Sequence, residues 1–133
     1  DNNVKALITN WLNSRAEELR LIEDHDEILL RHGPDTLLLQ VQLTQGRPDK
    51  SQLNTWMLLG NASLSHFQGA LAQAPATGAL WLTQCLQQST SEKPLLDSLQ
   101  ALLNQRDTWR AMITRLAKQA PRFQPTSLRS LPH

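Results

Sequence analysis

The sequence predicts an all-α fold, either an antiparallel helical bundle or a stack of helical hairpins, with about five helices. Leucine accounts for 26 of the 133 residues, whereas valine and isoleucine together account for six and tyrosine is absent. Leucine, alanine and glutamine favour helices, while strands favour the β-branched and aromatic residues that are scarce here. Apolar residues also recur at helical spacing, and the short connections between the segments are typical of antiparallel bundles.

The first predicted element is a long amphipathic helix over residues 3–31. Its apolar residues, from Val4 to Leu29, recur mostly at steps of three and four. The charged run at residues 23–27 leaves room for a kink or break near residue 25. Gly33 and Pro34 predict the end of the helix, because glycine favours the position after a helix and proline disfavours helix in the residue before it.

Residues 35–45 have an ambiguous pattern. Leu37, Leu39 and Val41 alternate with their neighbours at a period of two, which is typical of a strand. No other segment shows the same alternation, so a strand here would have nothing to pair with. We therefore expect a short helix that ends at Gly46.

A third helix is predicted over residues 48–74. Its apolar residues step by four and three as in a heptad seam: Leu53, Met57, Gly60, Leu64, Phe67, Leu71 and Ala74. A break at Gly60, with Asn61 capping a second helix, is the alternative. We favour one continuous helix.

Two further helices complete the expected fold. A short helix is predicted over residues 77–88, and a long one over residues 94–120, with Pro94 in its first turn and Pro121 after its end. Residues 1–120 are therefore expected to form a single helical domain. Residues 121–133, which contain proline, arginine and serine, are expected to form a flexible tail.

Composition limits the class of protein. The single cysteine, Cys85, excludes an intramolecular disulfide and a zinc site built from several cysteines. No apolar run approaches the roughly 20 residues that span a bilayer, so we expect a soluble protein without a membrane span. The chain begins with Asp1 rather than methionine, which suggests a processed product or a segment of a longer protein. The compartment stays open, with the cytoplasm favoured, and the leucine, glutamine and tryptophan usage favours a bacterial source.

No pattern in the sequence predicts catalysis, a metal or a cofactor. Cys85 has no charged neighbour in the sequence that would activate its thiol, and no serine has the flanking glycines of a nucleophile elbow. The acidic run at residues 23–27 lacks the spacing of a calcium-binding loop. We therefore expect a protein that is not an enzyme and binds neither a metal nor a cofactor.

Charge is unevenly distributed along the chain. Residues 1–35 have a net charge of −4 and residues 93–133 a net charge of +5, although the whole chain has a formal charge of +1. The basic residues of the last predicted helix do not gather on one helix face, and the pI of about 8.2 is lower than that of most nucleic-acid-binding domains. These observations weigh against nucleic-acid binding.

The favoured function is a non-catalytic interaction module, such as an adaptor, a chaperone-like protein or a regulatory subunit, that binds another polypeptide through a groove or charged end. Tryptophan and arginine are enriched where binding energy is concentrated, so the candidate partner-binding residues are Trp56, Arg106, Trp109 and Arg110. A sensory helical bundle that holds a small ligand is the main alternative, followed by a helical nucleic-acid-binding domain. The chain could also form homo-oligomers. The sequence does not identify the partner.

Overall fold

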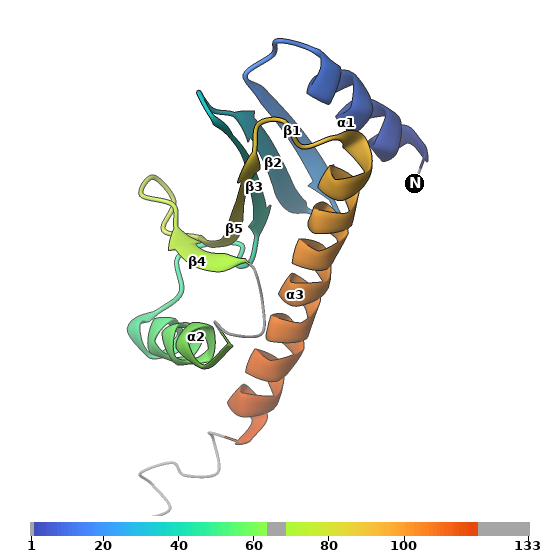
Figure 1. Ribbon diagram of the computed structural model, residues 1–133. Helices are drawn as coiled ribbons and strands as arrows, with labels where there is room; N and C mark the ends of the chain where they lie inside the picture. Colours follow the sequence, from blue (N-terminus) through green and yellow to red (C-terminus); the bar gives the residue numbers. More distant parts are fainter. Residues whose placement is uncertain (1, 64–68, 120–133) are drawn as a thin grey trace, which may run out of the picture.

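The computed structural model describes residues 2–63 and 69–119, and within these ranges it has an α+β fold with three helices and five strands (Figure 1). The elements follow in the order α1 (Asn2–Asn13), β1 (Glu18–Glu23), β2 (Asp26–His32), β3 (Thr36–Gln42), α2 (Lys50–Ser63), β4 (Ala70–Gln73), β5 (Leu80–Gln87) and α3 (Glu92–Gln119). The prediction of an all-α bundle is therefore wrong.

All five strands form one antiparallel sheet in the order β1-β2-β3-β5-β4, so that β1 and β4 are its edges. The His32 amide donates a hydrogen bond of 2.8 Å to the Glu17 carbonyl, which makes these residues a hydrogen-bonded pair. Because such pairs alternate along an antiparallel ladder, the amides and carbonyls of Glu18, Arg20 and Ile22 face away from β2. No other strand in the described part of the chain pairs with this edge.

The helix expected over residues 3–31 ends at Asn13 and is followed by a β-hairpin. The charged run that suggested a kink contains the hairpin turn, where Asp24 and His25 have φ angles of 51° and 73°. Two short strands joined by a two-residue turn place leucine and isoleucine at spacings that also fit a helix. Pairing between β1 and β2 decides in favour of the sheet.

The alternating segment at residues 35–45 forms β3 rather than the short helix that we expected. Its partners are β2 on one side and β5 on the other. Leu37, Leu39 and Val41 are fully buried on one face of the sheet. The sequence did not favour a strand here because the alternation in its partners, β2 and β5, is less regular.

The two middle helices predicted from the sequence are also corrected. The helix expected over residues 48–74 ends at Ser63 as α2, and Leu71 lies in β4; Leu64 and Phe67 are outside the described residues. The segment expected to be helical at residues 77–88 contains β5. Leu80 and Leu82 are buried there, while the intervening Trp81 is half-buried, as expected for a strand with one covered face.

The long helix at the end of the sequence is present as α3, and it begins two residues before Pro94. Its residues Leu95, Leu99, Leu102 and Trp109 are buried in the core beneath the helix. Leu116, further along the same helix, is exposed. The expected tail at residues 121–133 is outside the described residues, and the single-domain boundary at residue 120 stays a prediction.

The core lies between the sheet and the two helices α1 and α3, which both pack on the same face (Figure 1). From α1, Ile8 and Trp11 are buried in this core, and the Trp11 ring stacks on His32 of β2 with ring centroids 4.0 Å apart. The described helices therefore pack on the sheet and do not surround a core made by helices alone. This arrangement leaves α1 and α3 side by side on the sheet.

Candidate functional site

The four residues that the sequence singled out for partner binding lie at least partly inside the molecule. Trp56 and Trp109 are buried members of the core. Arg106 is buried as well, and Arg110 is half-buried. All four contribute to the folding of this chain, and their role in partner binding stays a prediction.

Arg106 and Arg110 join α3 to the β1–β2 hairpin. Arg110 donates hydrogen bonds of 2.8 and 3.0 Å to the two carboxylate oxygens of Asp26, a buried residue at the start of β2. Arg106 donates from Nη2 to Glu23 Oε1 at 3.1 Å and from Nε to Asp107 Oδ1 at 3.0 Å. Burial lowers the pKa of the Arg106 guanidinium, but the hydrogen bonds to Asp107 and Glu23 outweigh burial and raise the pKa above its ordinary value.

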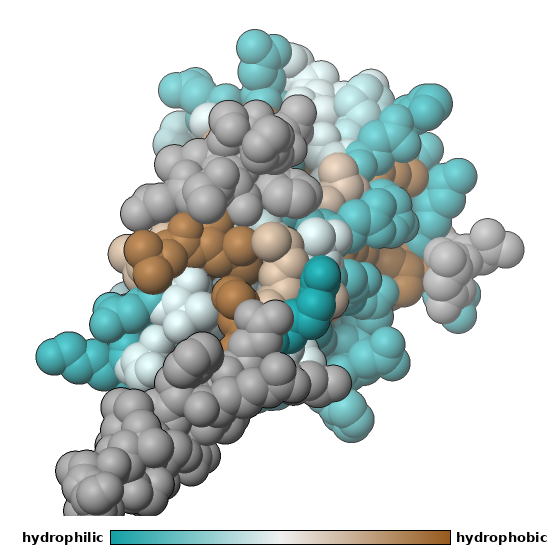
Figure 2. Space-filling view, turned by 90° about the horizontal axis from the view of Figure 1, so that it is seen from below, coloured by the Kyte–Doolittle hydropathy of each residue, from teal (hydrophilic) through white to brown (hydrophobic). Residues whose placement is uncertain are grey.

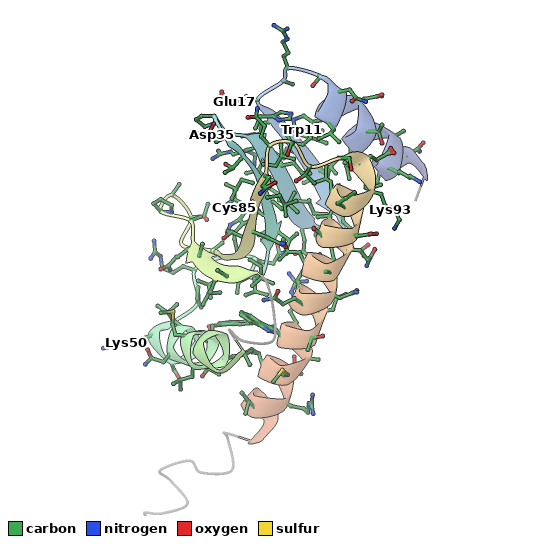
Figure 3. All side chains as sticks on the ribbon, in the orientation of Figure 1. Trp11, Glu17, Asp35, Lys50, Cys85 and Lys93 are labelled. Atoms are coloured by element: carbon green, nitrogen blue, oxygen red, sulfur yellow. The ribbon has the colours of Figure 1, made fainter. Side chains whose placement is uncertain are left out.

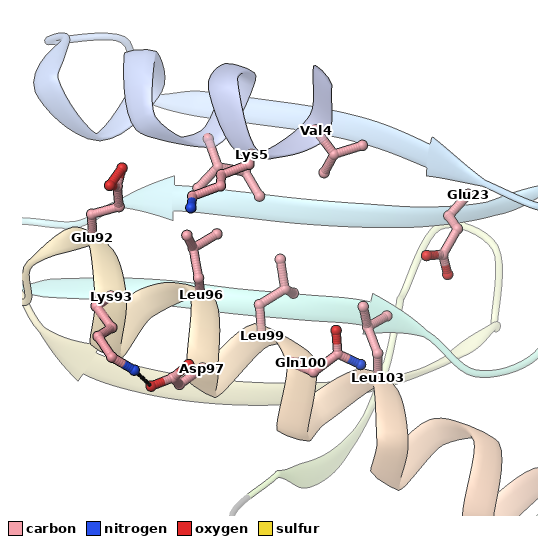
Figure 4. A pocket seen from close by; sticks show the side chains of 11 residues that line it. Val4, Lys5, Glu23, Glu92, Lys93, Leu96, Asp97, Leu99, Gln100 and Leu103 are labelled. Carbon is pink, nitrogen blue, oxygen red and sulfur yellow. Dashed lines mark hydrogen bonds and ion pairs between the residues drawn. The ribbon is translucent and has the colours of Figure 1, made fainter. Parts of the chain in front are cut away.

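A surface groove of about 570 Å³ separates α1 from α3 (Figure 4). We call it the α1–α3 groove. Its apolar lining comes from both helices and consists of Val4, Ile8, Leu96, Leu99 and Leu103. Charged and polar residues of α1, α3 and β1 complete it, namely Lys5, Glu23, Glu92, Lys93, Asp97 and Gln100.

The groove combines a buried apolar base with partly exposed walls. Ile8 and Leu99 are almost completely buried, whereas Val4 is 37% exposed. Leu7, on the same helix as Val4, is 48% exposed and adds apolar surface to α1. Such a surface can bury apolar side chains of a partner without any rearrangement of the core.

The two ends of the groove differ. Glu92 and Lys93 lie at one end, and Glu23 and Leu103 at the other (Figure 4). Thr9 Oγ1 of α1 donates a hydrogen bond of 2.6 Å to Glu92 Oε1, which ties the two helices together at the first end. Lys93 forms an exposed ion pair of 3.0 Å with Asp97.

The sequence analysis missed this groove, although it identified most of its apolar residues. Val4, Ile8 and Leu99 recur at the helical spacing that predicted the two helices. Their spacing indicates which side of each helix is apolar. It does not indicate that α1 and α3 lie far enough apart on the sheet to leave part of these stripes in contact with solvent.

Apolar side chains are also exposed at the end of the molecule formed by α2 and the last turns of α3. Met57, Leu58 and Leu116 are 51%, 70% and 45% exposed. Figure 2 looks at this end and shows brown apolar surface there.

The described residues contain no cluster suited to metal binding. Within residues 2–63 and 69–119, no three histidine, cysteine, aspartate or glutamate side chains come together as a possible metal site. Cys85 is exposed on β5 (Figure 3), on the sheet face opposite α1 and α3. In the same ranges, none of the helices has the length and apolar character needed to span a membrane.

No protein-family model matches the sequence, and no curated protein matches it either. Solved structures do match the fold. A chain from the crystal structure of the ExsC-ExsE complex is similar with a TM-score of 0.62 and 14% sequence identity, over 84% of this chain and 94% of that one. A chain from the HopA1-SchA chaperone-effector complex is similar with a TM-score of 0.61 and 16% identity, over 81% and 93% of the two chains.

A third similar chain comes from the heterodimeric ExoU-SpcU complex of the type III secretion system of Pseudomonas aeruginosa. It has a TM-score of 0.52 and 19% identity, over 84% of this chain and 95% of that one. At these identities the likeness is one of fold. The protein therefore has an α+β fold, with a five-stranded antiparallel sheet in its described residues, that is shared with chains from chaperone-effector and type III secretion complexes.

Proposed function

We propose that this protein is a non-catalytic, chaperone-like protein that holds a segment of another polypeptide in the α1–α3 groove. The observation that carries the proposal is the groove itself, because its apolar residues are partly exposed between two helices that are otherwise packed on the sheet. The fold supports the same conclusion, since similar chains come from complexes in which one protein is bound to another.

The groove has the dimensions of a short peptide site. From Glu92 to Leu103, α3 rises by about 16 Å, which equals about five residues of extended chain. Apolar side chains of a bound segment would pack against Leu96 and Val4. The polar residues at the rim would keep the protein in solution when the groove is empty. Burial of apolar surface is the main favourable term in most associations between proteins.

The competing functions have less support. A sensory bundle requires a ligand cavity enclosed by helices, and the described helices instead cover one face of a sheet. Nucleic-acid binding requires free basic side chains, whereas Arg106 and Arg110 already donate to carboxylates. Homo-oligomer formation stays a prediction, and Met57, Leu58 and Leu116 are the exposed apolar residues to examine for it.

The experiment compares partner capture by three forms of the full chain in lysate of its source organism. These are the wild type, Val4→Asp in the groove, and Leu116→Asp as a control of similar exposure, located more than three helical turns beyond Leu103. Lysates are treated with nuclease and washed at moderate salt. Circular dichroism first establishes that all three are folded.

We expect the wild type and Leu116→Asp to retain the same polypeptide in near-stoichiometric amount, and Val4→Asp to lose it. Reconstitution with the purified polypeptide then measures the loss directly. Equal retention by all three forms, or retention by none, would overturn the proposal.

A further inference from the structure

The carboxylate of Glu23 lies at one end of the α1–α3 groove, where it accepts a hydrogen bond from Arg106. Glu23 is the last residue of β1, and the turn that follows has positive φ angles at Asp24 and His25. Its Oε1 accepts the hydrogen bond from Arg106, whose side chain is only 9% exposed. The Glu23 side chain itself is 46% exposed, so the carboxylate is oriented by Arg106 and accessible to a partner.

The charges around this carboxylate do not balance. Arg110 neutralises Asp26, which leaves Arg106 as the one cation shared by Glu23 and Asp107. A third carboxylate, that of Asp26, lies further away, with its Oδ2 3.8 Å from the buried Nη1 of Arg106. Within the described residues, Glu23 forms no other ion pair, so this end of the groove has one uncompensated negative charge.

The other end of the groove has no such excess. Lys93 is paired with Asp97, and Lys5 and Glu92 contribute one charge of each sign. A bound segment therefore meets apolar surface along the middle of the groove, a neutral polar end, and a negative end at Glu23. This asymmetry defines both a charge preference and a direction for the segment.

We infer that the groove selects polypeptide segments with a lysine or arginine beside their apolar residues, which Glu23 binds in the position set by Arg106. The inference rests on the proposed function and adds the partner's chemistry to it. Glu23 would contact the bound segment, whereas Arg106 is a positioning residue that acts through Glu23. The basic residue is expected at the end of the segment that lies beside Leu103.

The test uses a displayed library of random 12-residue peptides, selected in parallel on the full-length wild type and four variants. Glu23→Gln removes the charge, and Arg106→Lys keeps a cation but removes the forked hydrogen bonds. Glu17→Gln is the matched control, because Glu17 is an exposed carboxylate outside the groove, and Val4→Asp tests the apolar part of the groove. Thermal unfolding establishes that each variant is folded before selection.

We expect the wild type and Glu17→Gln to enrich peptides that have apolar residues and a basic residue at fixed spacing. Glu23→Gln should keep the apolar residues and lose the basic one, and Arg106→Lys should weaken the basic preference in the same way. A selected peptide should lose about fivefold in affinity for the wild type when its basic residue is replaced by glutamine. The same replacement should have no effect on binding to Glu23→Gln, and added salt should reduce the difference.

Each contrary outcome has a distinct meaning. Enrichment of apolar residues with no basic preference in the wild type, or a basic preference that survives in Glu23→Gln, would overturn the inference and leave the proposed function standing. No enrichment on the wild type, or identical enrichment on Val4→Asp, would overturn the proposed function and the inference together.

Discussion

Arg110 binds both carboxylate oxygens of Asp26, and this two-point contact joins the later part of α3 to the start of β2 across 84 positions of sequence. Gln45 also donates to Asp26 Oδ1, and Arg110 donates from Nε to the Leu43 carbonyl at 3.0 Å. The carboxylate therefore organises the hairpin, the end of β3 and the helix around one buried point.

Replacement of Asp26 by asparagine should lower the free energy of unfolding by about 3 kcal/mol, because it leaves two arginines without their buried carboxylate. Urea denaturation followed by circular dichroism measures the change. Asp97→Asn is the control, since its ion pair with Lys93 is exposed, and it should change stability by about 0.5 kcal/mol or less. Similar small losses in both variants would show that the buried pair does not stabilise the fold.

Gly69 should not tolerate a side chain. A Cβ at this position would clash with Leu102 and lie 2.8 Å from Gln105 Oε1, which accepts a 3.1 Å hydrogen bond from the Gly69 amide. Gly69→Ala should therefore destabilise the protein by about 2 kcal/mol in a thermal or urea unfolding measurement. Gly46→Ala, where a Cβ would have no heavy atom within 4 Å, should change stability by no more than about 0.5 kcal/mol.

Trp109→Ala should lower the free energy of unfolding by about 4 kcal/mol, because the side chain is almost completely buried beneath α3. Any loss of partner binding in this variant would then follow from loss of the fold. Urea denaturation and a binding measurement on the same preparation separate the two effects. A variant that stays fully stable and loses binding would instead support the direct partner contact predicted from the sequence.

Stability at acidic pH should depend on Glu18. Hydrogen bonds from Arg20, and then from Arg31, hold the pKa of the Glu18 carboxyl below its ordinary value in the folded protein. Its contribution is therefore complete above the pKa of the unfolded chain and is lost as the pH falls through the folded pKa.

The measurement is the unfolding free energy from neutral pH to about pH 3. Glu18→Gln should reduce the loss of stability on the acid side and leave a flatter profile. Glu17→Gln is the neighbouring control, because Glu17 forms no ion pair within the described residues, and its profile should match that of the wild type. If the profile of Glu18→Gln coincides with that of the wild type, the ion pairs of Glu18 contribute nothing to stability.

The sequence was most informative where one periodicity extended over many residues. The final helix has several turns of leucine at helical spacing, and it was predicted to within two residues at its start. The alternation of Leu37, Leu39 and Val41 also indicated a strand correctly. That indication was set aside because its partners could not be recognised.

Those partners were hidden by leucine-rich composition. In β2, Ile28, Leu29 and Leu30 are consecutive and all buried, so the strand shows no alternation. In β5, Trp81 and Leu82 are adjacent and fit either a helix or a strand. Pairing across the sheet determines the secondary structure of such segments, and this pairing joins residues that are far apart in the sequence.

The candidate site was less predictable than the fold. Arg106 was predicted from the sequence to bind a partner, but its hydrogen bond to Glu23 depends on how the hairpin meets α3. The exposure of Val4 likewise depends on the distance between two packed helices. Neither the contact between the hairpin and α3 nor the distance between α1 and α3 can be read from composition and spacing.

The open edge of β1 has a consequence for how the protein behaves at high concentration. Within residues 2–63 and 69–119 no strand pairs with the amides and carbonyls of Glu18, Arg20 and Ile22, which therefore form a template on which another strand can add, and Ile22 is 66% exposed there. Resistance to fibre-like aggregation at this edge therefore depends on the charged side chains of Glu18 and Arg20. At high protein concentration, or where the charges of these two side chains are reduced, strands should add to this edge before the core unfolds.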